Sequence, residues 1–289
     1  MNDIRTIVKG IARLKPMPQV LHQIMDLARD SDADTARLAE AVACDPVLTA
    51  NLLKDANSSY YGRSSRFETV QQAVVFLGTT EVFKLVLVAG CRDTLTTAQD
   101  GYDLQAGELW RYSLSSALLA KEVAERCGLA EAQRVFTAAL LKDIGKVVLS
   151  QYVSEQYQRI RRLVDDGSHS FREAERVVLG IDHAELGAMV ALVWQFSPTM
   201  VALIRHHHQP FQCFGMEDEA AAVYIGDLLC MMLGAGVGGD GLSYRFQRPV
   251  LDRLGLTDSD LQRLLIAFEE QMERLNGLLG VPSKSAAAG

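Results

Sequence analysis

The sequence lacks any apolar run that approaches the roughly 20 residues needed to span a bilayer. Its opening segment, MNDIRTIVKGIARLK, mixes charged with apolar side chains and contains no signal-peptide core. We therefore expect a cytoplasmic protein that has neither a membrane segment nor a membrane partner.

Cysteine is scarce and shows no metal-binding spacing. The five cysteines are odd in number, scattered, and form no C-x-x-C pair: Cys44, Cys91, Cys127, Cys213 and Cys230. This pattern favours reduced, buried thiols over a disulfide framework or a zinc site built on cysteine.

An excess of basic charge is also missing, since the formal net charge is −7. Neutralising nucleic-acid phosphates requires clustered Lys and Arg, so we expect no nucleic-acid partner, although composition leaves a local basic patch open. Hydrophobic residues make up 48% and charged residues 22% of the 289 residues, which is typical of a globular chain with a sizeable core.

No segment shows the sustained alternation that indicates a strand, whereas helical spacing of apolar residues recurs throughout. We predict helices over 17–29, 35–43, 109–126, 182–194, 198–208 and 258–279, among others. Thr69 and Gly78 delimit a further short helix, and Ser170 with Glu173 forms a predicted capping box. The run KVVLSQYV after Gly145 is ambiguous but short, and the predicted fold class is all-α.

Two polar stretches interrupt the helices. Residues 93–108 indicate a boundary between two helical halves, and residues 234–241 form a Gly-rich loop. Because the loop lacks a preceding strand and a following Lys-Ser/Thr pair, the sequence does not favour a phosphate-binding loop there.

The candidate site consists of aspartates and histidines on successive helices: Asp143 in LLKDIGK, His183 in GIDHAELG, the run His206-His207-His208, and Asp227 in YIGDLL. Each has a structural explanation when taken alone. His183 could be a surface or hydrogen-bonded residue, and the histidine run could be a polar helix end. Together they match the inward-facing set from which a helical bundle builds a metal site, and hard divalent ions and iron accept this mixture of ligands.

Ordered signatures over about residues 10–212 give the chain a specific resemblance to the HDOD family. The N-terminal signatures are Leu14-x-Pro16-x-Pro18, Asp45-Pro46-x-Leu48, Asn57-Ser58-x-x-Tyr61-Gly62 and Val70-x-x-Ala73-x-x-x-Leu77-Gly78. The later ones are Leu109-Trp110-x-x-Ser113, Ala138-x-Leu140-Leu141-x-Asp143-Ile144-Gly145-Lys146, Glu175-x(4)-Gly180-x-x-His183-x-x-x-Gly187, Trp194 and His207-His208-x-Pro210.

The resemblance, together with the two polar stretches, predicts a domain organisation. We expect an N-terminal helical subdomain over 1–98, an HD-like helical bundle over 99–235, a C-terminal helical extension over 242–280 and a flexible tail over 281–289. The wider HD superfamily is named after a His-Asp doublet that holds divalent metal in phosphohydrolases.

The resemblance also implies an incomplete metal site. The histidine of the doublet is replaced by Lys142, and an earlier histidine ligand falls near Tyr112. A protonated lysine has no lone pair for a metal, and tyrosine binds one only after losing a proton whose ordinary pKa is about 10. Asp143, His183, His207, His208 and Asp227 remain as residual positions, so we expect no catalytic residues and no bound metal or other cofactor.

The sequence leaves two alternatives open for the position of the Lys142 side chain. Its ammonium group could replace the charge of the metal by pairing with Asp143 or Asp227, or its side chain could extend into solvent.

The resemblance favours a non-catalytic bacterial regulatory module that takes part in signal transduction and binds a protein partner or a small effector. The alternative is a metal-dependent phosphohydrolase acting on a cyclic dinucleotide or nucleotide through Asp143, His183, His207 and Asp227. Lys142 and Tyr112 weigh against that alternative.

Overall fold

The computed structural model describes residues 4–14, 35–57, 67–234, 239 and 246–279. Within this part every regular element is a helix, apart from a single bridge between Gln99 and Leu104. The predicted all-α class is therefore confirmed, and the ambiguous run after Gly145 lies inside α9 (Ile144–Asp165). Among the described helices, none combines the length and the apolar character that a membrane crossing requires.

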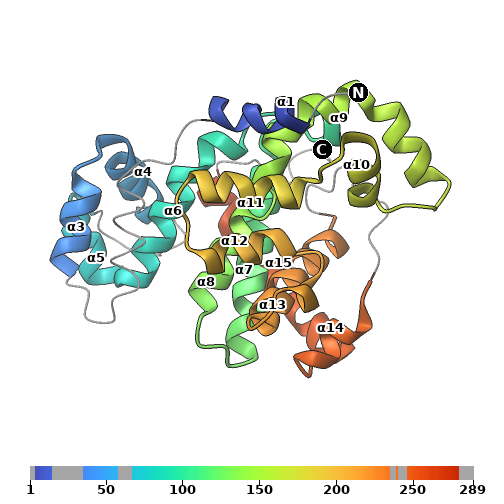
Figure 1. Cartoon of the computed structure of the whole chain (residues 1–289). Coiled ribbons are helices and arrows are strands. Elements are labelled where there is room, and N and C mark those ends of the chain that lie inside the picture. Colours follow the sequence, from blue (N-terminus) through green and yellow to red (C-terminus); the bar gives the residue numbers. More distant parts are fainter. Residues whose placement is uncertain (1–3, 15–34, 58–66, 235–238, 240–245, 280–289) are drawn as a thin grey trace, which may run out of the picture. The chain divides into compact units, whose positions relative to one another are not determined.

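The chain packs as two compact units, coloured along the sequence in Figure 1. One comprises residues 1–15 and 94–265, and the other comprises residues 16–93 and 266–289. The first contains α1 (Ile4–Lys9), η1 (Gly10–Arg13), η3 (Asp100–Tyr102), α7 (Glu108–Arg126), α8 (Ala132–Leu141), α9, α10 (Phe171–Leu179), α11 (His183–Val193), α12 (Pro198–His206), η4 (Pro210–Gln212), α13 (Glu217–Met232) and α14 (Arg248–Arg253).

The second unit contains α3 (Thr35–Ala43), α4 (Pro46–Ala56) and α5 (Val70–Leu77). Helices α6 (Thr79–Leu95) and α15 (Asp258–Leu279) each have residues in both units. The domain limits expected from the sequence stay a prediction.

Local sequence signals set several helix ends as expected. The Thr69 hydroxyl accepts a hydrogen bond from the Gln72 backbone N–H, completing a capping box at the start of α5. The Ser170 hydroxyl does the same with the backbone N–H of Glu173 at α10. The helix predicted over 17–29 and most of the loop 234–241 lie outside the described residues.

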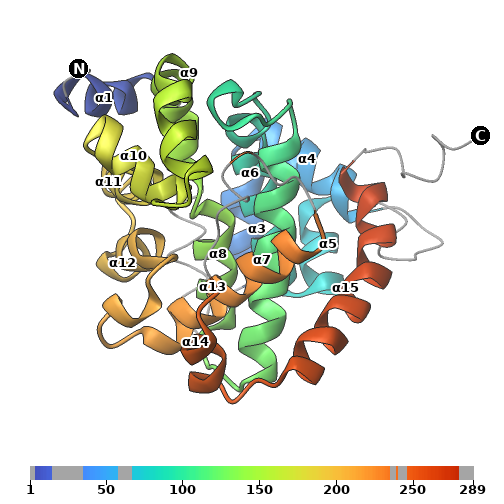
Figure 2. The same cartoon turned by 90° about the vertical axis from the view of Figure 1, so that its right-hand side faces the viewer.

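The core of the first unit forms where α7, α8 and α13 pack against one another, as Figure 2 shows. Helix α9 packs against both α10 and α11, and α11 packs in turn against α12. Helix α1 lies beside α9, where the Tyr152 hydroxyl donates to the Thr6 carbonyl over 3.2 Å. The helices that carry the candidate residues are thus held in one core.

Gly226 allows α13 to approach α7 closely. A Cβ at this position would lie 2.5 Å from the Ala120 backbone nitrogen and 2.6 Å from the Ala120 Cβ. Because no larger residue fits this contact, the two backbones approach near Gly226. The crossing brings Tyr112 of α7 within hydrogen-bond distance of Asp227, 115 positions later in the chain.

Gly145 performs the same role between α9 and α11. A Cβ there would lie 2.0 Å from the His183 carbonyl oxygen and 2.6 Å from the Gly187 nitrogen. This contact brings the start of α9 against the start of α11. Gly145, two residues after Asp143, thus allows Asp143 and His183 to be neighbours.

We predict that Gly145→Ala lowers the free energy of unfolding by about 3 kcal/mol or more, since the new methyl group meets backbone atoms that cannot move independently. Gly187→Ala is the matched control on the facing helix. Its added Cβ would meet the Ile204 side chain at 3.3 Å, and alanine's helix propensity offsets up to about 1 kcal/mol. Urea denaturation measures both variants, and equal losses would contradict the prediction.

Candidate functional site

The Lys142–Asp143 pair occupies the junction between α8 and α9. Lys142 is the C-terminal cap of α8, and Asp143 is the N-terminal cap of α9. Lys142 is fully buried and Asp143 is 2% exposed. The alternative in which Lys142 extends into solvent is therefore wrong.

The Lys142 ammonium group pairs with two carboxylates from different helices. It forms an ion pair with the adjacent Asp143 and a second with Asp227 of α13, where Nζ lies 2.8 Å from Oδ1. The same ammonium lies 4.5 Å from the centre of the Tyr112 ring. The expected pairing of Lys142 with Asp143 or Asp227 is confirmed for both acids.

Burial and charge act in opposite directions on this pair. Burial alone would lower the pKa of Lys142, but Asp143 and Asp227 outweigh it and raise that pKa above its ordinary value. Burial would likewise raise the pKa of Asp143, yet Lys142 and Lys146 hold it well below its usual range. Lys146 contributes directly, with Nζ 3.0 Å from Asp143 Oδ1. Both members of the pair are therefore charged at neutral pH.

Tyr112 is a neutral phenol in this environment. Its hydroxyl donates to Asp227 Oδ1 over 2.7 Å. Burial, followed by the nearby Asp227 charge, raises the pKa of Tyr112 well above its ordinary value. The Tyr112 hydroxyl, which lies near a ligand position expected from the family resemblance, is therefore a hydrogen-bond donor. It is unsuited to binding a metal as a phenolate.

His183 is held by a buried acid, Glu175. Glu175 Oε2 accepts from the His183 backbone N–H over 3.0 Å and lies 2.8 Å from His183 Nδ1. The other oxygen of Glu175 accepts from the Tyr102 hydroxyl over 2.6 Å. Burial alone would lower the pKa of His183, but Glu175 outweighs it and raises that pKa.

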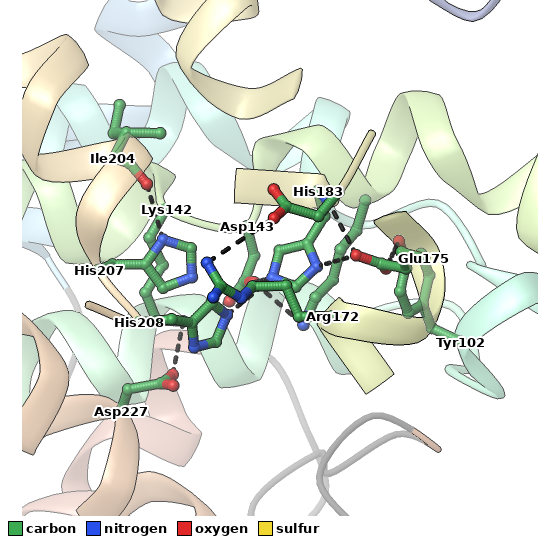
Figure 3. A network of polar contacts seen from close by, with 12 residues as sticks. Tyr102, Lys142, Asp143, Arg172, Glu175, His183, Ile204, His207, His208 and Asp227 are labelled. Atoms are coloured by element: carbon green, nitrogen blue, oxygen red, sulfur yellow. Dashed lines mark hydrogen bonds and ion pairs between the residues drawn. The ribbon is translucent and has the colours of Figure 1, made fainter. Parts of the chain in front are cut away.

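His207 and His208 complete a cluster with His183, as Figure 3 shows. His207 Nδ1 lies 2.7 Å from the Ile204 carbonyl oxygen, and His208 Nε2 lies 2.9 Å from His183 Nε2. Burial, as the main cause, holds the pKa values of both His207 and His208 well below the ordinary value. His206, which ends α12, is not a member of the cluster.

A cavity of about 150 Å³ opens beside these groups. Five of the residues that line it are expected site positions or their replacements: Tyr112, Asp143, His183, His208 and Asp227. Other lining residues were not expected at the site from the sequence, and they include Lys146, Phe171, Arg172, Tyr224 and Gln247. Arg172 forms an ion pair with Asp182, with Nη1 3.7 Å from Asp182 Oδ2.

Comparison with known proteins identifies the family. The HDOD domain family matches residues 14–210, more than half of the chain. The chain belongs to the HDOD domain family.

Two solved structures share the HDOD bundle. One, from Marinobacter aquaeolei VT8, is named as a candidate signal transduction protein; it is 23% identical with a TM-score of 0.76, over 93% of this chain and 59% of that one. The other, from Shewanella amazonensis SB2B, is named as a candidate phosphohydrolase; it is 22% identical with a TM-score of 0.71, over 95% of this chain and 97% of that one. At these identities the likeness establishes the fold, and the HD-like bundle expected from the sequence is confirmed.

A sequence relative, described as an uncharacterised protein of Treponema pallidum (strain Nichols), is 23% identical over 199 residues. The match covers 68% of this chain and 38% of that protein. The HDOD chain thus accounts for well under half of the length of this relative.

The carboxylates of this HDOD chain do not fit the divalent metal that the HD superfamily holds here. Asp143 and Asp227 both bind the ammonium group of Lys142, which supplies the positive charge between them. A metal at the same place would meet that charge and would find no lone pair on Lys142. Asp143 and Asp227 therefore neutralise the ammonium group of Lys142 and do not provide a metal site.

We predict that Glu175→Gln lowers the pKa of His183, because burial then acts without the compensating carboxylate. A histidine with a raised folded-state pKa adds stability that is fully present below its unfolded pKa of about 6.5 and is lost as the pH rises through the folded value. The variant should therefore lose stability mainly in the acidic range.

NMR titration of the histidine side chains and urea denaturation between pH 5 and pH 8 measure the two effects. The control is Glu173→Gln, a half-buried residue in the first turn of the same helix whose amide can keep the capping contact with Ser170. A His183 pKa unchanged in Glu175→Gln would contradict the prediction.

Proposed function

We propose that this chain is a non-catalytic, regulatory HDOD module that takes part in signal transduction and binds a small effector in the cavity beside Lys142. The observation that carries the proposal is the Lys142 ammonium group between Asp143 and Asp227. Hydrolysis of a phosphodiester in the HD superfamily needs metal ions that polarise the phosphoryl group and supply hydroxide. The acids that would hold those ions are engaged by a lysine.

The cavity supports the binding part of the proposal. About 150 Å³ is enough for one small ring or for the polar end of a larger molecule. Lys146 and Arg172 provide hydrogen-bond donors with positive charge, while Phe171 and Tyr224 provide aromatic faces. These walls come from α9, α10 and α13, so a ligand there would contact several helices and could favour one arrangement of them over another.

A metal-dependent phosphohydrolase is the competing function, and the histidine cluster beside Asp143 is the observation that favours it. One assay separates the two: hydrolysis of cyclic dinucleotides and of a generic phosphodiester with Mn²⁺ added. We expect no turnover above that of the Asp143→Ala variant. Turnover that depends on Asp143 would overturn the non-catalytic proposal.

Effector binding has its own test. Thermal unfolding with small anionic and nucleotide compounds should reveal a ligand that raises Tm, and Lys146→Met should reduce that shift because Lys146 lines the cavity. A protein partner found by pull-down, without any such ligand, would place the binding function on another surface.

We predict that Lys142→Met lowers the free energy of unfolding by about 3–5 kcal/mol, because it leaves two buried carboxylates without their shared cation. Methionine keeps most of the side-chain volume, so the loss reports mainly on charge. Lys121→Met is the control, since Lys121 pairs with Glu125 near the surface and should cost less than about 1 kcal/mol. Chemical denaturation at pH 7 measures both, and equal costs would show that Lys142 does not neutralise the site.

A further inference from the structure

Three histidines converge at one point of the first unit. His183 begins α11, and His207 and His208 follow the last residue of α12. One ring nitrogen from each lies within 4.8 Å of the others. The His183 Nε2 to His208 Nε2 distance of 2.9 Å shows that the rings point toward one another.

Two of the three rings are already oriented as metal ligands are. Glu175 engages Nδ1 of His183, and the Ile204 carbonyl accepts from Nδ1 of His207. A carboxylate or a backbone carbonyl on the far nitrogen is the usual partner of a metal-bound histidine, because it fixes the tautomer and the ring orientation. In each ring it is Nε2 that remains for the cluster.

His207 supplies the independent observation that points to a ligand. Its side chain is fully buried, and its Nε2 has no hydrogen-bond partner among the described residues. Leaving a buried polar atom unpaired costs about 1–3 kcal/mol, so such an atom calls for an explanation. Since Nδ1 donates to Ile204, Nε2 carries the lone pair, and the centre of the His207 ring lies 5.7 Å from that of His183 and 4.0 Å from that of His208.

We propose that His183, His207 and His208 bind one zinc-type transition-metal ion without the help of Asp143 or Asp227. The donor set is three imidazoles, which suits Zn²⁺, Co²⁺, Ni²⁺ or Cu²⁺, whereas Mg²⁺ and Mn²⁺ favour oxygen ligands. This arrangement differs from a mixed carboxylate and histidine centre because Lys142 occupies the acids.

Binding also accounts for the proton in the cluster. One proton lies in the hydrogen bond between His183 Nε2 and His208 Nε2, and it must leave both nitrogens before they coordinate the metal. If His208 carries it, it moves to Nδ1 of the same neutral ring; if His183 carries it as an imidazolium, it is released to solvent. The proposal is independent of the effector and of catalysis. A three-histidine site can hold a metal in a protein that hydrolyses nothing.

The test is metal binding by the full chain after treatment with a chelator. Isothermal titration with Zn²⁺ should give one site per chain, and Zn²⁺ should raise Tm, while Mg²⁺ and Mn²⁺ at the same concentration should do neither. His207→Gln and His208→Gln should each weaken Zn²⁺ binding at least about 10-fold. Glu175→Gln should weaken it about 10–100-fold through loss of orientation.

His206→Gln is the matched control, because His206 adjoins the cluster in sequence but lies outside it. This variant should keep the wild-type affinity for Zn²⁺. Circular dichroism checks folding, and the partly exposed His208 gives a second ligand variant if His207→Gln fails to fold.

Three results would overturn the proposal: no Zn²⁺ binding by wild type, equal binding by His208→Gln and wild type, or loss of binding in His206→Gln. None of these results alone decides whether the chain hydrolyses a phosphodiester, so the failure of this inference can be told apart from the failure of the proposed function.

Discussion

The buried positive charge of Lys142 is the constraint on which the candidate site depends. An ammonium ion with no exposed surface is tolerated only if carboxylates and hydrogen bonds replace its water. Asp143 and Asp227 supply the charge, and Tyr112 supplies both an aromatic face and a hydrogen bond to Asp227. Burial of Lys142 therefore requires three parts of the bundle to pack together: α7, α13 and the α8–α9 junction. The remaining helices of this unit pack around these three.

Glycines make this packing sterically possible. Gly226 lets α13 approach α7, and Gly145 lets α9 approach α11. The polar contacts depend on those approaches, since side chains of fixed length cannot reach across a wider gap. The same crossing at Gly145 places His183 beside Asp143, with His183 Nε2 3.7 Å from Asp143 Oδ1. Packing and electrostatics in this core therefore depend on each other. A larger side chain at either glycine would separate the helices and lengthen the distances between the charged groups.

Local patterns predicted the helices well, because capping and apolar spacing act over a few residues. The Thr69 and Ser170 caps form as expected. The site was predicted only in part, because its contacts join residues far apart in the chain. Tyr112 and Asp227 are separated by 115 positions, and Tyr102 and Glu175 by 73. Glu175 appeared within a family signature, yet nothing in its neighbourhood of sequence showed that its carboxylate holds His183.

The retained acids have a sufficient physical explanation that does not involve hydrolysis. Asp143 and Asp227 are needed to neutralise Lys142, and either one alone would leave part of a buried charge uncompensated. Glu175 is needed to orient His183. The histidines are different, because neutralising Lys142 does not require three imidazoles or an unpaired Nε2 on His207. The carboxylates and the histidines therefore call for separate explanations. The carboxylates balance the charge of Lys142, and the histidines are explained by a ligand.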